Sequence, residues 1–595
     1  MLKPLVDYAK QRGVPEKGFA PKPARWAILL ADDGRYLGVS ELGDTSAKSN
    51  SGITFPKAPE FSFSNMRAGG VHKSHFLIDS ADVVALIGKN SEDAKTRAKH
   101  LFFQDLLRKA GQVMSELRVA ADALADEANM AAIRADLIAA KAKPTDKVTL
   151  RIGDAFPVES DAWHDWWRAF RVSVGGEKAP KGAMRCFVTG ELAEPAITHP
   201  KIKGLAEPGS PVAEFPMVSF KQPSFRSFGL EQSANSAVSA DAASAYRAAL
   251  NYLLAKHAHA LAGAKVVHWF RKAVELEDDP VAFLIKPQGD VDPESPGADR
   301  KSLEAQQRAE EFLRAVETGQ RVELLGNEYY ALTLSASGGR VMVRDWMEGR
   351  FEALAANIKA WFEDLEIVHR AGGQTAPWPK FLGVLAATAR ELDEVPAPLA
   401  ASLWRTAIHA EPVPQAAMAR TLHRVRVDII QDRPANHARM GLLKAYHLRK
   451  HSRKGGTDMP EQLQPYLNEN HPDPAYHCGR LMAVLAAIQR AALGDVGAGV
   501  VQRYYAAASS TPALVLGRLT RQAQFHLNKI NPKLTWWYES KLSAIWGSIG
   551  SEIPRTLDLE QQSLFALGYY QQLADLRTKR ADEPENGTEA DSPTE

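Results

Sequence analysis

Cysteine is scarce in this chain and long apolar segments are missing, and both absences restrict what it can be. Cys186 and Cys478 are the only cysteines among 595 residues, so a disulfide framework and a four-cysteine zinc site are excluded. The longest apolar runs, Trp26–Ala31 and Leu481–Ile488, are far shorter than the roughly 20 residues of a membrane-spanning helix. The N-terminus becomes polar too early for a signal peptide. We therefore expect a protein of the reducing cytoplasm with no membrane partner.

Familiar catalytic signatures are also absent. No phosphate-binding loop occurs, and Gly494, Gly497 and Gly499 do not form a dinucleotide fingerprint because no strand precedes them. His164-Asp165 is a dipeptide that some metal-dependent nucleases use, but no further ligands follow at suitable spacing. Cys186 has no evident histidine partner. We expect no catalytic residue, metal or cofactor, and a scattered active site stays an alternative.

The first two thirds of the chain mix strand and helix patterns. Trp26–Leu30 and Tyr36–Val39 flank Asp33-Gly34, which predicts a β-hairpin. A second hairpin is predicted around Gly338-Gly339, between Tyr329–Ser335 and Arg340–Arg344. Helices are predicted at 2–12, 92–142, 242–262 and 351–368, and a helix over 161–170 carries three tryptophans at core spacing.

The last third reads as helix throughout. Leu481, Val484, Leu485 and Ile488 fall on one helical face. Ser510-Thr511-Pro512 predicts an N-cap hydroxyl followed by proline at the first helical position, and Asp558 with Gln561 predicts a capping box. A chain of this length needs more than one core. We predict an α+β domain over 1–371, a Gly/Pro-rich linker over 372–379, a helical bundle over 380–577 and a disordered acidic tail over 578–595.

Charge is concentrated in one stretch. Between Arg420 and Lys454 there are ten Lys or Arg residues and only two acids, Asp428 and Asp432. This imbalance predicts a surface that neutralises phosphates, and a merely solvated surface is the alternative. A long polar loop, residues 44–75, joins glycines to Asn, Arg and Lys side chains that can donate to bases in a DNA groove.

Several of these stretches resemble one family, the large subunit of the type I-C CRISPR surveillance complex, Cascade. The resemblance rests on motifs that occur in the same order along nearly the whole chain. They are Arg67–Val71 with Phe76–Asp79, Val188–Glu191, His199–Gly204, Ser219-Phe220, Ala249–Leu254, Tyr330–Ser335 with Arg340–Arg344, Leu467–Asn470, Ala475–Leu481, Ala483–Gln489, Ala508–Ala513, His526–Lys529 and Phe565–Gln571. Ala331, Gly338-Gly339, His477-Cys478 and the acidic tail depart from the family pattern.

The resemblance implies a non-catalytic role in antiviral defence. Such a subunit joins the crRNA-bound backbone subunits and the subunit that caps the crRNA 5′ end. It reads the protospacer-adjacent motif (PAM) in double-stranded DNA, opens the duplex, stabilises the R-loop with its displaced strand, and recruits a helicase–nuclease. In this division of labour the protein reads the motif and the backbone, while base pairing reads the target.

The resemblance also yields candidate contacts. For motif reading these are Asn65, Arg67, Gly69, Gly70, His72, Lys73, Lys201, Lys203, Gln232 and Asn235. For the strand backbone they are Arg420, Arg424, Arg426, Arg439, Lys444, Arg449, Lys450, Arg453, Lys454 and Lys529. Arg480, Gln489, His526 and Gln571 are further candidates for contacts with a strand or a subunit.

The C-terminal bundle resembles the Cascade small subunit, which the same gene can supply by internal translation initiation. Met459 and Met482 are the candidate starts, and Met459 is preferred because it keeps the whole predicted helix that follows. Two other functions stay open: a metal-dependent nuclease that uses His164-Asp165, and a scaffold that binds only proteins.

Overall fold

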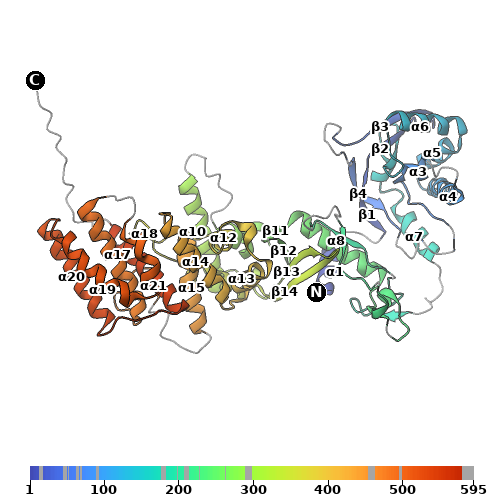
Figure 1. The fold of residues 1–595 in the computed structure, drawn as a ribbon. Helices are drawn as coiled ribbons and strands as arrows, with labels where there is room; N and C mark the ends of the chain where they lie inside the picture. Colours follow the sequence, from blue (N-terminus) through green and yellow to red (C-terminus); the bar gives the residue numbers. More distant parts are fainter. Residues whose placement is uncertain are drawn as a thin grey trace, which may run out of the picture. The chain divides into compact units, whose positions relative to one another are not determined.

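The computed structural model describes residues 1–12, 18–44, 50, 52–61, 66, 70, 72–88, 93–175, 183–196, 198–206, 214–220, 222–226, 228–261, 263–287, 298–452, 463–494 and 499–578. The chain forms two compact units, and Figure 1 labels many of their helices and strands. Unit 1 comprises Met1–His257 with Ala336–Met342, and unit 2 comprises Ala258–Ser335 with the chain from Val343 onward. Small sheets and helices are mixed in unit 1, and one sheet precedes many helices in unit 2, so the predicted α+β class is confirmed.

In its described residues, unit 1 contains short strands and seven α-helices. Its elements are α1 (Leu2–Gln11), β1 (Phe19–Ala24), β2 (Trp26–Leu30), β3 (Tyr36–Glu41), β4 (Ile53–Pro59), β5 (Asp79–Ser80), α3 (Ala81–Val84), α4 (Ala94–Ala110), α5 (Ser115–Ala125), α6 (Glu127–Ala139), β6 (Lys147–Ile152), α7 (His164–Gly175), β7 (Met184–Arg185), β8 (Leu192–Ala193), β9 (Lys201–Lys203), β10 (Glu214–Pro216) and α8 (Ala240–Lys256). Single 3₁₀ turns lie at Pro157–Glu159, Pro223–Phe225 and Gln232–Asn235.

The main sheet of unit 1 has the strand order β3-β2-β6-β5. The first predicted hairpin is confirmed as the antiparallel pair β2–β3, and β2 also pairs in parallel with β6. Gly34 has a φ of +87°, which its lack of a Cβ permits, and the Arg35 N–H donates to Asp33 Oδ1 at 3.0 Å to close the turn. Trp163 and Trp167 are fully buried in the core of this unit, as their spacing predicts.

Unit 2 begins with a sheet in the order β11-β12-β13-β14 and continues as helices. Its elements are β11 (Ala258–Leu261), β12 (Ala264–Phe270), α9 (Pro280–Ile285), α10 (Ala298–Glu317), β13 (Glu328–Ser337), β14 (Arg340–Arg350), α11 (Phe351–Leu365), α12 (Phe381–Ala387), α13 (Ala397–His409), α14 (Gln415–Ile430), α15 (His437–Ser452), α17 (Pro474–Leu493), α18 (Val500–Ala508), α19 (Pro512–Leu527), α20 (Pro532–Ile549) and α21 (Leu559–Arg577). Further 3₁₀ turns lie at Leu276–Asp278, Val322–Leu324 and Leu392–Glu394.

Helix α17 is the centre of the C-terminal helices. All residues from Ala475 to Leu485 are buried, because α18, α19, α20 and α21 all pack against it. The crossing of α17 with α21 is especially close: a Cβ at Gly479 would overlap the Phe565 carbonyl oxygen, and a Cβ at Gly568 would overlap that of Tyr476. The two backbones can therefore meet only where both helices carry glycine.

The cap predictions have a mixed outcome. The capping box of Asp558 and Gln561 is confirmed at the start of α21, and Pro512 does occupy the first turn of α19. The predicted hydroxyl cap on α19 is wrong, because the Thr511 Oγ1 donates backwards to the Ala507 carbonyl at 3.1 Å. The preceding helix α18 ends only a few residues earlier, so its free carbonyls capture this hydroxyl.

The stretch 372–379, predicted as a linker, lies within unit 2. The Ala376 N–H donates to the Ile367 carbonyl at 2.8 Å, and Trp378 stacks on Phe362 with ring centroids 4.2 Å apart. The compact units divide instead at His257/Ala258. The acidic tail lies outside the described residues apart from Thr578.

Candidate nucleic-acid interface

Much of the basic stretch between Arg420 and Lys454 lies inside unit 2. Arg439, Lys444 and Arg449 are only 8%, 2% and 7% exposed. Arg439 is paired with Asp428, and the Lys444 ammonium donates to the Glu363 carbonyl at 3.1 Å. Burial lowers the pKa of Lys444 to about 8 and that of Arg439 to about 10. In this structure these charges join helices to one another, contrary to the prediction that they face phosphates.

Arg433 is exposed, and four further members of the stretch are half-buried and engaged. Arg420 donates to the Thr388 carbonyl at 3.2 Å, Arg424 lies 3.5 Å from Asp428, Arg426 donates to Gln562, and Lys450 pairs with Glu560. Arg453 and Lys454 lie outside the described residues. A count of charges along the sequence missed this outcome because neutralising carboxylates such as Glu560 and Asp364 come from distant helices.

The motif-reading candidates in unit 1 differ in accessibility. Asn65, Arg67 and Gly69 lie outside the described residues, whereas Gly70 and His72 are exposed. Lys73 is only 6% exposed, and burial lowers its pKa. Of the described candidates before β9, two are thus open to a partner in this conformation.

The second group of candidates follows in β9 and the turn before α8. Lys201 and Lys203 are exposed on either side of buried Ile202, and Lys203 lies 3.2 Å from Glu214. Gln232 is exposed and adopts a φ of +49°. The Asn235 amide donates to the carbonyls of Leu230 and Gln232, so it serves its own turn. The side chains of Lys201, Lys203 and Gln232 are therefore exposed to solvent.

An exposed basic surface does occur further along, on α18, α19 and α20. Its members, which we call the α18–α20 basic set, are Arg503, Arg518, Arg521, Lys529 and Lys533. Within the described part of the chain, none of these side chains makes an ion pair or a hydrogen bond. Between residues 500 and 550 the only acid is Glu539. The predicted candidate Lys529 belongs to this set, and the other four members were missed.

Large apolar side chains are exposed among these basic residues. Leu514 is 76% exposed, and Phe525 and Trp536 are each 70% exposed. On α19, Leu514, Arg518, Arg521 and Phe525 recur with helical spacing and so share one face. The same spacing is visible in the sequence, and it could have identified this face had exposed rather than buried positions been sought. Cationic side chains interleaved with aromatic ones suit a strand of nucleic acid, because phosphates meet charge and bases meet rings.

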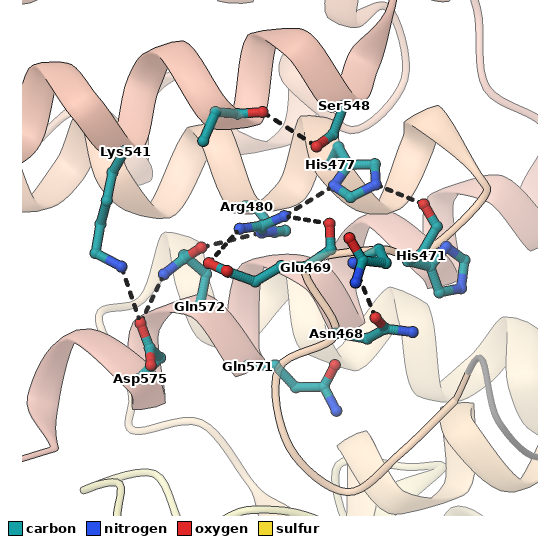
Figure 2. Close-up of polar contacts among 12 residues, drawn as sticks. Asn468, Glu469, His471, His477, Arg480, Lys541, Ser548, Gln571, Gln572 and Asp575 are labelled. Carbon is teal, nitrogen blue, oxygen red and sulfur yellow. Dashed lines mark hydrogen bonds and ion pairs between the residues drawn. The ribbon is translucent and has the colours of Figure 1, made fainter.

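Arg480 and Gln571, predicted as surface contacts, are instead buried at 2% and 3% exposure. Figure 2 shows Arg480 at the centre of a polar cluster between α17, α21 and the preceding loop. Its guanidinium donates to Gln572 Oε1 at 3.0 Å, to the Glu469 carbonyl at 3.2 Å and to Glu469 Oε1 at 3.1 Å. The prediction fails because a polar side chain in a bundle need not lie on its surface when partners satisfy it.

The same cluster positions the remaining polar groups of α17 and α21. Tyr476 donates to Gln571 Oε1 at 2.5 Å, and the Gln571 amide donates to the carbonyls of Gln464 and Pro465. Gln489 accepts the Val500 N–H at 2.7 Å and so caps α18. His526 is half-buried. Gln571 therefore holds the loop 463–473 against α21, and Gln489 connects the end of α17 to the start of α18.

The nuclease alternative relies on His164 and Asp165, which the structure does not bring together. The His164 side chain is 7% exposed, lies 3.0 Å from Asp161 and packs edge-on against Phe19. The Asp165 carboxylate is exposed and pairs with Arg168. Among the described residues, no group of three His, Cys, Asp or Glu side chains is placed to hold a metal ion. No helix among them combines the length and the apolar character needed to cross a membrane.

The fold and these surfaces define an α+β protein whose C-terminal helices surround one buried helix and present unpaired cations beside exposed rings. The family model described as "CRISPR-associated protein (Cas_Csd1)" matches residues 5–577, so the chain belongs to that family. The resemblance to a CRISPR-associated protein of the Cascade type is thereby confirmed. No curated protein matches the chain.

Proposed function

We propose that this chain is the large, non-catalytic subunit of a type I-C surveillance complex. In this role it reads the PAM beside the DNA target, helps to open the duplex, holds the displaced strand and recruits a helicase–nuclease. Its partners are the crRNA-bound backbone subunits, the subunit that caps the crRNA 5′ end, and small subunits. Membership of the CRISPR-associated family supports this proposal.

The observation that carries the strand-holding part is the α18–α20 basic set. The segment from α18 to α20 carries five exposed cations that have no carboxylate partner among the described residues, together with Phe525 and Trp536, which are exposed at a cost unless something covers them. Phosphate neutralisation by such residues accounts for most of the sequence-independent affinity of nucleic-acid-binding proteins. We therefore assign the strand contact to this set, together with any exposed members of the predicted stretch.

Motif reading is assigned to the N-terminal part, residues 1–371. His72, Lys201, Lys203 and Gln232 are the described candidates whose side chains reach solvent. Gln pairs best with adenine and Lys with guanine at the major-groove edge, and each good pair is worth about 1–3 kcal/mol of discrimination. Residues 380–577 supply the part that resembles a small subunit.

The internal start is best placed before α17. Met482 lies in the middle of this helix and is fully buried, so a product that begins there would lack Tyr476, Gly479 and Arg480. A product from Met459 would keep α17–α21, whose shared apolar core draws on these helices. Detection of only the full-length chain by mass spectrometry of cells would argue against any internal start.

The strand contact is tested by charge reversal on α19. Replacing Arg518 and Arg521 with Glu should weaken binding of DNA by the assembled complex at every sequence. It should also reduce the slope of log K against log salt, by about 0.7 for each lost contact with single-stranded DNA. Gel shifts at several salt concentrations, with and without the other subunits, provide the measurement.

Arg314→Glu is the matched control, because Arg314 is exposed on α10 of the same unit and has no ion-pair partner among the described residues. It should leave the slope unchanged. If the Arg518→Glu, Arg521→Glu variant and the control bind DNA with the same affinity, and if the complex binds DNA equally well without this chain, a scaffold that binds only proteins is the better description.

A further inference from the structure

A large cavity of about 1200 Å³ opens within unit 2, and no member of the α18–α20 basic set is among its lining residues. It lies among the ends of α14, α17 and α21, the beginnings of α15, α18 and α20, and the loop at 370–373. Pockets that hold one small ligand usually measure about 300–1,000 Å³. This cavity therefore has room for part of a polymer.

The lining carries an excess of positive charge. Five arginines line the cavity, Arg370, Arg433, Arg439, Arg490 and Arg577, against two carboxylates, Asp428 and Asp432. Asp428 is already matched by Arg439, Arg424 at 3.5 Å and Arg433 at 4.0 Å, and Asp432 accepts a hydrogen bond from Gln502 at 2.7 Å.

The remaining three arginines have no carboxylate partner among the described residues. Burial lowers the pKa of Arg577, and the nearby charges of Arg490 and Arg370 lower it further. Like charges gathered at a cavity are relieved by an anionic ligand, and the planar guanidinium fork matches phosphate.

The rim is held in place before any ligand arrives. The Arg577 guanidinium donates to the Arg370 carbonyl at 3.1 Å, and the Gly373 N–H donates to Thr578 Oγ1 at 3.2 Å. Gly372 lies so close to the end of α21 that a Cβ there would overlap Thr578. A fixed rim loses little conformational entropy on binding.

Four aromatic residues contribute to the lining, Trp537 and Tyr538 from α20 and Tyr569 and Tyr570 from α21. Trp537 is half-buried, whereas the three tyrosines are buried. The Tyr569 hydroxyl lies near Arg577, Arg490 and Asp432, whose charges act on its pKa after the larger effect of burial. Rings beside guanidinium groups are the combination that holds single-stranded nucleic acid, since bases stack on the rings and phosphates meet the cations.

We propose that this cavity is a second binding site for single-stranded nucleic acid, in which Arg370, Arg490 and Arg577 hold phosphates and Trp537 receives a base. The inference rests on the proposed function, in which the displaced strand is the ligand. The aromatic lining and the volume favour nucleic acid over an acidic peptide, which would use the arginines alone.

The test combines affinity with the location of the bound strand. The full chain and the assembled complex are each bound to a single-stranded DNA containing 5-iododeoxyuridine, crosslinked by light and mapped by mass spectrometry. Crosslinks are expected in the peptides that contain Trp537–Tyr538 or Tyr569–Tyr570. They should disappear in the double variant Arg490→Gln, Arg577→Gln, and its salt slope should fall by about 1.4.

Three further variants separate binding from folding. Trp537→Ala should weaken binding about 5- to 100-fold, whereas Arg490→Lys should keep most of the salt slope because it keeps the charge. Arg555→Gln should change nothing. Arg490→Lys and Arg555→Gln should unfold at the temperature of the parent. Trp537→Ala and the double variant lose core packing and a rim hydrogen bond, so all binding is measured at a temperature at which every variant is folded.

Crosslinks found only on α19 or elsewhere, with affinity unchanged in the double variant, would overturn the cavity proposal and leave the proposed function intact. Displacement of the strand by poly-glutamate as readily as by oligothymidine would overturn it in favour of an acidic protein partner. If neither the chain nor the complex binds DNA, the proposed function itself fails.

Discussion

Gly479 and Gly568 show how much one missing side chain can determine. Each lies where a Cβ would overlap a backbone carbonyl of the opposite helix, Phe565 for the first and Tyr476 for the second. Glycine in a helix normally destabilises it by about 0.5–1 kcal/mol relative to alanine. At this crossing glycine is instead more stabilising than alanine, because α17 can pack closely on α21 only where a Cβ is absent.

Gly479→Ala or Gly568→Ala should therefore lower the free energy of unfolding by about 1–3 kcal/mol, the usual cost of overpacking. Gly517 is the matched control, since it is exposed on α19 and an added Cβ would meet nothing within 4 Å. Gly517→Ala should raise stability by about 0.5–1 kcal/mol. Urea unfolding measures the free energy of unfolding of all three variants. Equal changes at the three positions would contradict the close crossing.

Lys444 predicts a pH dependence. Burial lowers its pKa to about 8 in the folded protein, whereas an unfolded lysine titrates near 10.4. Between these values the unfolded chain binds more protons, so this group makes stability rise with pH. Relative to Lys444→Met, the wild type should gain up to about 1.4 kcal/mol per pH unit between about pH 8 and 10. A flat difference in unfolding free energy would show that the ammonium is solvated.

At the level of elements, cationic side chains of α15 bind this helix to its neighbours. The Arg449 guanidinium donates to Asp364 at 2.6 Å and to the Thr406 carbonyl, and it lies over the Trp361 ring at 5.2 Å. One side chain thereby connects α15 with α11 and α13. A guanidinium on the helix surface would have no such partners.

Arg449→Ala should destabilise unit 2 by about 3–5 kcal/mol, because it leaves the Asp364 carboxylate buried without its partner. Lys450→Ala is the comparison: its ion pair with Glu560 is about one third exposed, so its loss should cost less than about 1 kcal/mol. Thermal unfolding distinguishes the two. A stable Arg449→Ala protein with weakened DNA binding would instead return this residue to the phosphate surface.

The sequence predicted elements well and surfaces poorly, for a physical reason. Both hairpins, the buried face of α17 and the Asp558 capping box depend on neighbours in sequence, which periodicity and turn chemistry encode. Whether Arg439 or Arg480 faces water depends on Asp428 and Gln572, and only the folded chain shows those pairings. Apart from Lys529, the α18–α20 basic set was missed because a charge count gives no weight to scattered cations, and the spacing on α19 was searched for buried positions only.

At the scale of the whole molecule, the core of unit 2 crosses the predicted boundary at 372–379. Trp361 and Phe362 of α11 are fully buried in the same apolar cluster as Trp404 of α13 and Leu443 of α15. A bundle that begins at residue 380 would lack α11. Its neighbours α13 and α15 would then expose the faces that α11 covers.

A fragment of residues 380–578 should therefore bind a hydrophobic dye strongly and melt without cooperativity, whereas 258–578 should unfold in one sharp transition. Hydrogen exchange should still protect α17 in both fragments, since its partners α18–α21 are present. A cooperative, dye-free 380–578 fragment would restore the boundary at the Gly/Pro stretch.

The crossing of α17 with α21 also constrains the order of events during synthesis. The ribosome completes α17 before α21, which closes its glycine-lined side and is the last helix of the described residues to emerge. Until α21 leaves the exit tunnel, Tyr476 and Arg480 lack Gln571 and Gln572, the partners that satisfy them in the finished fold. A ribosome that stops before α21 thus releases a chain with an open polar seam, which chaperones and proteases can recognise.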